Sequence, residues 1–385
     1  MVTGFGVHTG FGRGSAAIRH GVFTPNPSFA PTTRFDCAPY RTSLAMASSD
    51  DQPMRDLLAR CAEDAVRAAE LTLPRETAVL IGCAGDFTAI TRFWRTRRRD
   101  DRDRATTVRE DLRTMDAVPA HQADLLADRF GLCGTRLAFT NACVASATAI
   151  IHGWRLISSG RVDTALCAGA YLGEEYNFAK FDSGMALSRD GAVRPFSADR
   201  SGLLLGDGVA AIVLESRRHA RRRGARPLAR LAGCGVAADA YHIARPHPTG
   251  AGLTAAIGKA LRSAGVDPAD VDYVNAHGTG TQANDSAETA GLRAAFGHRT
   301  NAIPASSTKS TTGHMLEAAG AVEFVISLLA LLDGNLPPTA GYTTADPACD
   351  LDYVPNQPRR ADLRRVVTVN AAFGGINTAM LLERL

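Results

Sequence analysis

The fold class is decided by two stretches, Leu137-Ala138-Phe139-Thr140-Asn141-Ala142-Cys143 and Val274-Asn275-Ala276-His277-Gly278-Thr279-Gly280-Thr281. In each stretch an apolar run with the length of a buried strand leads into a turn of small and polar residues. Residues 142–157, which are small and apolar, predict a helix directly after the first turn. Because each half of the chain contains such a strand followed by a turn, we expect a duplicated α/β unit.

The rest of the chain shows the same alternation of helical and strand patterns. Helices are predicted at 55–70, 252–264 and 317–332, and strands at 77–83, 137–140, 163–169, 208–214, 272–276, 365–371 and 378–383. Strands alternating with helices predict layered α/β architecture. We expect an N-terminal half at 1–215, an Arg-rich connector at 216–227 and a C-terminal half at 228–385.

Composition excludes several classes of protein. The 385 residues are 45% hydrophobic and 21% charged, which is enough apolar material for a core and excludes a disordered chain. The net charge of +4 does not by itself describe a nucleic-acid binder. There is no apolar stretch of about 20 residues and no secretory signal pattern at the start, so we expect a soluble, cytoplasmic protein.

Cysteine and lysine usage narrow the search for a site. The eight cysteines have no CxxC spacing and no neighbouring histidine cluster, so no metal site is expected. Of the 43 basic residues, only three are lysine: Lys180, Lys259 and Lys309. Each lysine that remains in such an arginine-biased chain is a candidate for a position that requires a compact ammonium group.

Cys143 is the first candidate for a reactive group. A cysteine between a strand and a helix lies at the positive end of the helix, where the dipole and free N–H groups favour the thiolate and lower the pKa. The same N–H groups can bind an oxyanion. Taken alone, Cys143 is also typical of a small buried residue.

Three further motifs carry candidate functional residues. After His277, glycines allow close backbone approach, and the hydroxyls of Thr279 and Thr281 can bind a long polar substrate arm. The alternative for this segment is a surface turn with an incidental histidine. A further motif is Ser306-Ser307-Thr308-Lys309-Ser310-Thr311-Thr312-Gly313-His314. No glycine precedes its lysine, which excludes a phosphate-binding P-loop. The motif therefore contains either a functional Lys–His pair or a solvated lysine. Gly374 and Gly375 predict a hairpin turn.

Taken in order, Cys143, His277, Lys309 with His314, and Phe373-Gly374-Gly375 resemble the β-ketoacyl synthase family, of the type that elongates acyl chains. The resemblance runs along nearly the whole chain and includes residues 2–7, 194–200, 206–208, 239–242 and 246–252. It implies a thiolase-like fold of duplicated αβαβα layers. It also implies decarboxylative Claisen condensation, in fatty acid or polyketide biosynthesis, of an enzyme-bound acyl group with malonyl-acyl carrier protein.

The resemblance assigns expected roles to individual residues. Cys143 would carry the acyl group, and the N–H groups of Cys143 and Phe373 would form an oxyanion hole, with Phe373 also gating the acyl pocket. His277 and His314 would stabilise the enolate formed by loss of carbon dioxide. Lys309, supported by Glu323, would hold His314 and tune its charge. Gly374 and Gly375 would be supporting residues of the site.

The resemblance also implies partners. Substrates would arrive as phosphopantetheine thioesters on an acyl carrier protein, with no metal or other cofactor, no nucleic acid and no membrane. The chain would form a homodimer or a heterodimer with a chain-length-factor-like subunit. Segment 92–104 has seven Arg and three Asp and could steer an acidic carrier protein, although a solvated charged loop explains it equally well.

Three other interpretations stay open. A thiolase would need a second reactive cysteine near the C-terminal Gly-Gly turn, and residues 370–380 have none. A non-catalytic chain-length-factor-like subunit would lack the nucleophile, which is present here. An atypical ketosynthase could join other substrates, because several residues around the expected acyl pocket depart from the family pattern: Asn141, Ser146, Asp207 and Ala371.

Overall fold

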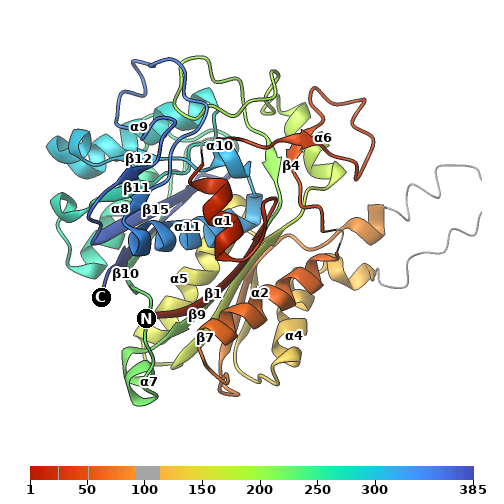
Figure 1. The fold of residues 1–385 in the computed structure, drawn as a ribbon, viewed down its shortest axis with the longest axis vertical. Coiled ribbons are helices and arrows are strands. Elements are labelled where there is room, and N and C mark those ends of the chain that lie inside the picture. Colours follow the sequence, from red (N-terminus) through yellow and green to blue (C-terminus); the bar gives the residue numbers. More distant parts are fainter. Residues whose placement is uncertain (25, 51, 92–112) are drawn as a thin grey trace, which may run out of the picture.

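Two mixed β-sheets form the framework of the molecule (Figure 1). The structure, a computed structural model, describes residues 1–24, 26–50, 52–91 and 113–385. The first sheet has the order β2-β1-β9-β7-β5-β6, and its strands are β1 (Val2–Thr9), β2 (Gly12–Arg13), β5 (Ala78–Gly82), β6 (Arg136–Phe139), β7 (Thr164–Tyr171) and β9 (Gly208–Glu215). The second has the order β10-β16-β15-β11-β12, and its strands are β10 (Arg230–Ala238), β11 (Tyr273–Asn275), β12 (Ala305–Ser306), β15 (Arg365–Ala371) and β16 (Ile376–Glu383).

Leaving aside the short β2, the two sheets have the same topology. In chain order within each half, both sheets read first-fifth-fourth-second-third across the sheet. In both, the first strand is antiparallel to the fifth and the fifth to the fourth, whereas the fourth, second and third are mutually parallel. The expected duplication of an α/β unit is therefore confirmed by strand order and direction.

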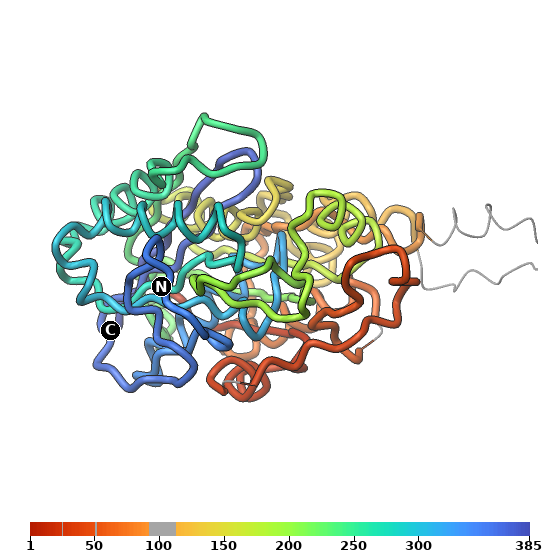
Figure 2. Tube along the Cα trace, turned by 90° about the horizontal axis from the view of Figure 1, so that it is seen from above, coloured from red at the N-terminus to blue at the C-terminus, as the bar shows by residue number. Residues whose placement is uncertain are grey.

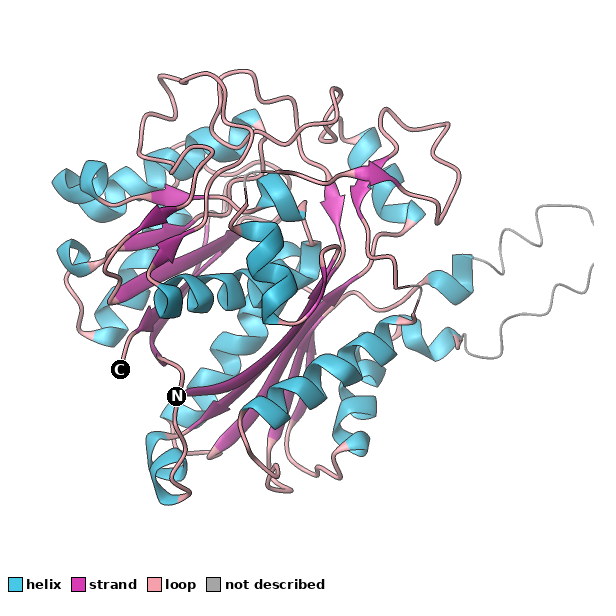
Figure 3. Cartoon of the chain, viewed as in Figure 1, coloured by secondary structure: helices cyan, strands magenta, loops and turns pink. Residues whose placement is uncertain are grey.

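The helices form three layers around the two sheets (Figure 3). The helices are α1 (Ser15–Val22), α2 (Met54–Ala68), α4 (Pro119–Arg129), α5 (Ala145–Ser158), α6 (Glu175–Ser183), α7 (Arg217–Arg222), α8 (Ala251–Ala264), α9 (Gln282–Phe296), α10 (Lys309–Thr312) and α11 (Ala319–Asp333). Helices α2 and α4 cover the outer face of the first sheet, and α8 with α9 that of the second. Helices α5 and α11 lie between the sheets, which completes the predicted αβαβα arrangement. Seen from above, the two halves lie side by side (Figure 2).

The apolar pattern of the strands explains why each sheet is buried on both faces. In β9, Val209, Ala211 and Val213 pack outward against α2, whereas Ala210, Ile212 and Leu214 pack toward the middle layer. Side chains alternate along a strand, so a continuous apolar run fills two cores at once. The middle helix α11 is apolar on all sides, and its residues 319–331 are all buried.

One core joins the two halves. The middle-layer cluster contains residues of both sheets together with α5 and α11.

The proposed boundary at 216–227 contains α7 and stays a prediction, as does the cytoplasmic location. Among the described residues no helix has both the length and the apolar character needed to cross a membrane.

The remaining elements are short and lie mainly near the ends of the sheets. They comprise the strands β3 (Ala30–Pro31), β4 (Leu44–Met46), β8 (Leu205–Gly206), β13 (Asn335–Leu336) and β14 (Arg359–Arg360), and the 3₁₀ turns η1 (Thr114–Ala117), η2 (Ala142–Val144), η3 (Pro268–Asp270), η4 (Gly297–Ala302) and η5 (Leu316–Ala318). Two of these turns, η2 and η5, immediately precede the middle helices α5 and α11. The start of each middle helix is therefore set by a tight turn.

Candidate active site

Cys143 lies in the turn η2, between the end of β6 and the start of α5. The preceding residue, Ala142, has φ 55°, a left-handed conformation that costs energy for a residue with a side chain. This geometry allows the chain to pass from strand to helix within a few residues. Among the described residues no backbone acceptor is found for the N–H of Phe373, and the backbone N–H of Cys143 lies beside the sulfur of the same residue, so both N–H groups stay candidates for the predicted oxyanion hole.

His277 follows β11 and is held by a buried carboxylate. Glu288 of α9 accepts hydrogen bonds from the backbone N–H of His277 at 2.6 Å and of Gly278 at 2.7 Å. Burial raises the pKa of Glu288 to about 7. The sequence analysis identified neither Glu288 nor the helix α9 that carries it, because α9 has no clear apolar stripe.

His314 lies after α10 and is anchored through its backbone. Its N–H donates to the carbonyl oxygen of Leu204 at 2.7 Å, and its own carbonyl accepts from Gly206 N–H at 3.1 Å. These contacts direct the imidazole toward the other half of the chain, where Nε2 lies 3.1 Å from the sulfur of Cys143. The rings of His277 and His314 are 5.4 Å apart, nearly perpendicular at 83°. The structure therefore brings together the cysteine and both histidines that the sequence predicts.

Lys309 is buried, with an exposed fraction of 1%, and its ammonium group links three polar groups. Its Nζ donates to Glu323 Oε1 at 2.5 Å and to the carbonyl oxygen of His277 at 2.6 Å, and it lies 3.3 Å from His277 Nδ1. The other oxygen of Glu323 accepts from Asn370 Nδ2 at 2.5 Å. The pairing of Lys309 with Glu323 was expected and is confirmed.

The expected contact between Lys309 and His314 is corrected by the structure. Lys309 and His277 follow the neighbouring parallel strands β12 and β11, so their side chains meet. Gly313, at φ 68°, then turns the chain away, so that His314 pairs with β8 instead. Lys309 therefore holds His277 directly and acts on His314 only through its charge.

The pKa of Cys143 also differs from the expectation. Burial, together with the smaller effect of the nearby Glu317 and against an opposing effect of Lys309, raises the pKa of the Cys143 thiol to about 12. Desolvation therefore outweighs the helix dipole that the sequence interpretation invoked. The resting group is a thiol, and it needs a base to become a nucleophile.

Both histidines are neutral at physiological pH. Burial and the charge of Lys309 lower the pKa of His277 and of His314 well below 6.5. Since an ammonium group can only donate, Nδ1 of His277 accepts from Lys309 and its proton resides on Nε2. A neutral His314, with Nε2 beside the sulfur, can accept the proton of Cys143.

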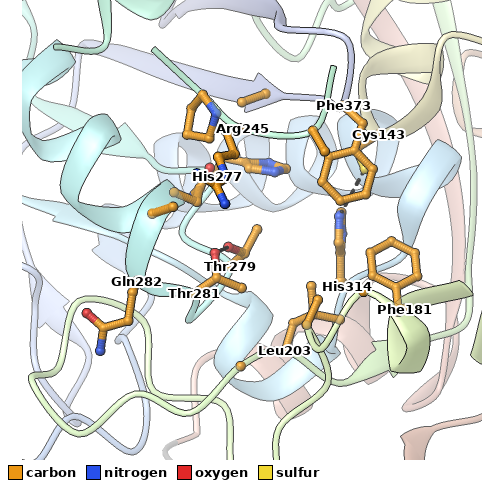
Figure 4. A pocket seen from close by; sticks show the side chains of 18 of the residues that line it. Cys143, Phe181, Leu203, Arg245, His277, Thr279, Thr281, Gln282, His314 and Phe373 are labelled. Atoms are coloured by element: carbon orange, nitrogen blue, oxygen red, sulfur yellow. Dashed lines mark hydrogen bonds between the residues drawn. The ribbon is translucent and has the colours of Figure 1, made fainter. Parts of the chain in front are cut away.

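These groups line a cavity of about 530 Å³ (Figure 4). Thr279 and Thr281 lie on its wall, joined by a hydrogen bond of 2.9 Å between their hydroxyls. Phe373 covers the cavity beside Cys143, is 45% exposed, and stacks on Phe181 with ring centroids 5.8 Å apart. The predicted gating position of Phe373 is thus at the cavity wall.

The Gly-Gly turn joins β15 to β16, as predicted. Gly374 and Gly375 have φ of 85° and 74°, and the N–H of Gly374 donates to the carbonyl oxygen of Ile243 at 2.7 Å. This contact fixes the turn that carries Phe373 against loop 239–250. A residue with a side chain would be strained at either glycine.

Residues that depart from the family pattern make specific contacts. Asn141 Nδ2 donates to Thr148 Oγ1 at 2.9 Å, and Ser146 Oγ accepts from Ala321 N–H at 2.9 Å, which ties α5 to α11. Asp207 forms an ion pair of 2.5 Å with Arg34. Ala371 lines the cavity.

The basic segment 92–104 lies outside the described residues, and among those described no group of His, Cys, Asp and Glu could hold a metal ion.

The fold is a duplicated α/β scaffold with a cysteine and two histidines at one cavity, and comparison with known proteins identifies the family. Residues 24–220 match the family model for the β-ketoacyl synthase N-terminal domain, and residues 228–343 match that for the β-ketoacyl synthase C-terminal domain. The chain belongs to the β-ketoacyl synthase family.

Particular relatives show how close the similarity is. The chain is 38% identical over 263 residues to 3-oxoacyl-[acyl-carrier-protein] synthase 2 of Coxiella burnetii, an alignment that covers 67% of this chain and 64% of that protein. It is 40% identical over 272 residues to the putative polyketide beta-ketoacyl synthase 1 of Streptomyces halstedii, covering 69% and 64%. The chain thus matches somewhat less than two thirds of the length of these two relatives.

Among solved structures, the ishigamide ketosynthase/chain length factor superimposes with a TM-score of 0.90 at 32% identity, covering 100% of this chain and 98% of that chain. This similarity extends over both sheets and confirms the predicted thiolase-like fold.

Proposed function

We propose that this protein is a β-ketoacyl-[acyl carrier protein] synthase, an acyltransferase that condenses an acyl group on Cys143 with malonyl-acyl carrier protein. The observation that carries the proposal is the 3.1 Å contact between Cys143 Sγ and His314 Nε2, with His277 on the same cavity wall. A thiol, a neutral base and a second imidazole that donates a proton are the groups that this reaction requires.

The first half-reaction loads the acyl group. His314 Nε2 takes the proton of Cys143 as the sulfur attacks the thioester carbonyl carbon of an acyl-phosphopantetheine. The negative oxygen is stabilised by the N–H groups of Cys143 and Phe373. When the intermediate collapses, the phosphopantetheine sulfur leaves and takes the proton from His314, which regenerates a neutral imidazole.

The second half-reaction forms the carbon–carbon bond. Malonyl-phosphopantetheine enters along Thr279 and Thr281. Its thioester oxygen accepts hydrogen bonds from Nε2–H of His277 and, once Cys143 is acylated and the neutral His314 has changed to its Nε2–H tautomer, from Nε2–H of His314. Loss of carbon dioxide leaves an enolate on that oxygen, and its carbanion carbon attacks the acyl carbonyl on Cys143. The Cys143 thiolate then leaves and takes up one proton from solvent, and the 3-oxoacyl chain remains on the carrier.

Partners follow from this chemistry. We propose an acyl carrier protein as the donor of both substrates and no cofactor other than its phosphopantetheine arm. The similarity to a ketosynthase/chain length factor structure supports pairing with such a subunit or with a second copy of this chain. A purely non-catalytic partner role is disfavoured because Cys143, His277 and His314 are all present and in contact range.

The test separates the two half-reactions. Incubation with acyl-pantetheine should increase the intact mass of the wild-type protein by one acyl group, and Cys143→Ala should abolish the increase. Cys143→Ala should retain decarboxylation of malonyl-carrier protein, whereas His277→Ala should lower it by about 10²-fold or more while leaving acyl loading less affected. Absence of acylation on Cys143 in the wild-type protein would overturn the proposal.

A further inference from the structure

The carboxylate of Glu323 is held from two sides in the middle layer. Glu323 lies on α11 and has an exposed fraction of 0%. Its Oε1 accepts from Lys309 Nζ at 2.5 Å, and its Oε2 accepts from Asn370 Nδ2, also at 2.5 Å. Asn370 lies on β15, the strand that packs directly against α11 (Figure 1). A helix, a strand and the lysine motif thus meet at one buried carboxylate.

Asn370 is a costly residue for packing alone. It is fully buried, and its Oδ1 has no hydrogen-bond partner within the part of the chain that the structure describes. An acceptor left in this way destabilises the folded state, whereas an apolar residue of similar size would not. Because a carboxylate can only accept, the amide must turn its NH₂ group towards Glu323. The donation to Glu323 is therefore what an asparagine contributes at this position.

The ammonium group of Lys309 uses all three of its N–H bonds. They reach Glu323 Oε1, the carbonyl oxygen of His277 and, at 3.3 Å, Nδ1 of His277. These three acceptors are satisfied together only while the nitrogen carries three protons. Since the pair is buried, the charge on Lys309 in turn requires an ionised Glu323 beside it.

A proton shift within this ion pair would disable His277. If the proton moved from Lys309 Nζ to Glu323 Oε1, one N–H bond would break and one O–H bond would form, with no change in total charge. The neutral amine has two N–H bonds and one lone pair, and the lone pair would accept from Nδ1–H of His277. Nε2 of His277 would then carry no proton and could not donate to the thioester oxygen during decarboxylation.

Donation by Asn370 opposes this shift. A hydrogen bond to a carboxylate stabilises its ionised form. Burial, the largest effect, raises the pKa of Glu323, whereas Lys309 and, to a smaller extent, Asn370 lower it. Without the amide, Glu323 would be more basic and the pair would move towards its neutral form. Glu288 cannot compensate, because it binds only the backbone N–H groups that follow β11 and leaves the imidazole of His277 untouched.

We infer that Asn370 is a positioning residue, which keeps the Lys309–Glu323 pair ionised. Through this pair Asn370 holds the proton of His277 on Nε2, where decarboxylation of the malonyl group requires it. The effect on catalysis rests on the proposed function, whereas the effect on the tautomer of His277 needs no substrate. Asn370 acts only through Glu323 and touches neither the thioester nor the acyl group.

The first test measures the two half-reactions separately in Asn370→Leu, which has a similar volume and no donor. Decarboxylation is followed as release of carbon dioxide from malonyl-pantetheine, and loading as the intact mass after incubation with octanoyl-pantetheine. We expect kcat for decarboxylation to fall about 10- to 100-fold, the loss typical of a removed outer hydrogen-bond partner, with KM changed by less than about twofold. Loading of Cys143 uses His314 as the base and should change by less than about twofold.

The second test detects the tautomer directly. In protein labelled with ¹⁵N-histidine, the chemical shifts of the ring nitrogens show which nitrogen carries the proton, and the signals missing from His277→Ala identify those of His277. We expect Nε2–H in the wild-type protein and a shift of population to Nδ1–H in Asn370→Leu.

Two controls separate this effect from a general loss of packing. Thr368→Val removes a buried hydroxyl from the same face of β15, two residues away, where it donates to Asn275 at 3.3 Å. It should leave both kcat and the tautomer unchanged. In a Glu323→Gln background, Asn370→Leu should lower decarboxylation little further, because Asn370 acts through the carboxylate.

Each outcome decides one question. If Asn370→Leu keeps the wild-type kcat and tautomer, if Thr368→Val lowers decarboxylation equally, or if the effects add in the Glu323→Gln background, the inference is wrong. If circular dichroism shows that Asn370→Leu does not fold, Asn370→Ala takes its place with the same expected changes. If the wild-type protein neither acylates Cys143 nor decarboxylates malonyl-pantetheine, the proposed function fails, and the tautomer measurement still decides the role of Asn370.

Discussion

The surroundings of Lys309 explain why this position has a lysine and not an arginine. Its ammonium group reaches Glu323 and His277 from the compact end of an extended side chain, in a space where 1% of the residue is exposed. A guanidinium group is larger and planar and would not fit the same three acceptors. Removing one partner of a buried ion pair commonly costs about 3–5 kcal/mol of stability. Neither Lys309 nor Glu323 can therefore be replaced by a neutral residue without a large loss of stability.

The reactivity of Cys143 should depend steeply on pH. With a pKa of about 12, only on the order of 10⁻⁴ of the thiol is ionised at pH 8, and the thiolate is the species that is alkylated. The rate of iodoacetamide modification of Cys143, followed by peptide mass mapping, should rise about tenfold per pH unit from pH 7 to 10.

A plateau above pH 7–8 would contradict this and would restore the helix-dipole interpretation of a pre-formed thiolate. The Cys143→Ala variant supplies the background from the other cysteines. Because the pKa of His314 lies well below 6.5, acyl loading should in contrast stay constant between pH 8 and about 6, as the base remains neutral.

Sequence motifs identified the reacting groups but not their surroundings. Cys143, His277, Lys309 and His314 stand in characteristic local contexts, so they were predictable. Glu317 was not, because its position depends on the contact between two turns more than 170 residues apart. The raised pKa of Cys143 likewise depends on burial by the whole fold, which no local pattern reports.

At the scale of elements, the position of α5 depends on one glycine in β5. A β-carbon on Gly82 would lie 2.1 Å from the backbone nitrogen of Ser146, so any side chain there must displace the start of α5. Since Cys143 immediately precedes this helix, the displacement would also move the sulfur away from His314.

Gly82→Ala should therefore lower the free energy of unfolding by about 1–3 kcal/mol, measured by urea denaturation, and should slow acyl loading of Cys143. Gly258→Ala is the matched control in α8, where the added methyl group meets only the flexible end of Arg262. It should stabilise the protein by about 0.5–1 kcal/mol and leave loading unchanged. Equal behaviour of the two variants would refute the steric argument.

Long apolar elements were predicted well, and elements with buried polar groups were not. Strong apolar patterns gave α2, α8, α11, β7 and β9 within one to two residues of their observed bounds. Helix α9 was not predicted, because it buries Asp285 and Glu288 and so lacks a clear apolar stripe. No helix was predicted at 119–129, yet this segment forms α4 with a narrow buried apolar face of Ala123, Leu126 and Ala127.

At the scale of the molecule, the shared middle layer should make the two halves unfold together. The α11 residue Phe324 is fully buried between the sheets, and its cluster includes residues from 2 to 382. Phe324→Ala should lower stability by about 3–5 kcal/mol and shift a single calorimetric transition as a whole.

Two resolved transitions, of which only one moves in Phe324→Ala, would show that 1–215 and 228–385 are independent domains. The conservative Ser327→Ala variant, in the same helix, loses only a bond of 2.8 Å to the carbonyl oxygen of Glu323. It should move the transition far less.

The strand order also determines when each sheet can close during synthesis on the ribosome. The opening strand β1 pairs with β9, about 200 residues later, and β10 pairs with β16, about 150 residues later. Until the later partner emerges, the earlier strand has an unpaired edge and the middle layer stays uncovered. Such long-range pairing slows folding, so we expect the nascent chain to expose apolar surface until residue 383 has left the tunnel.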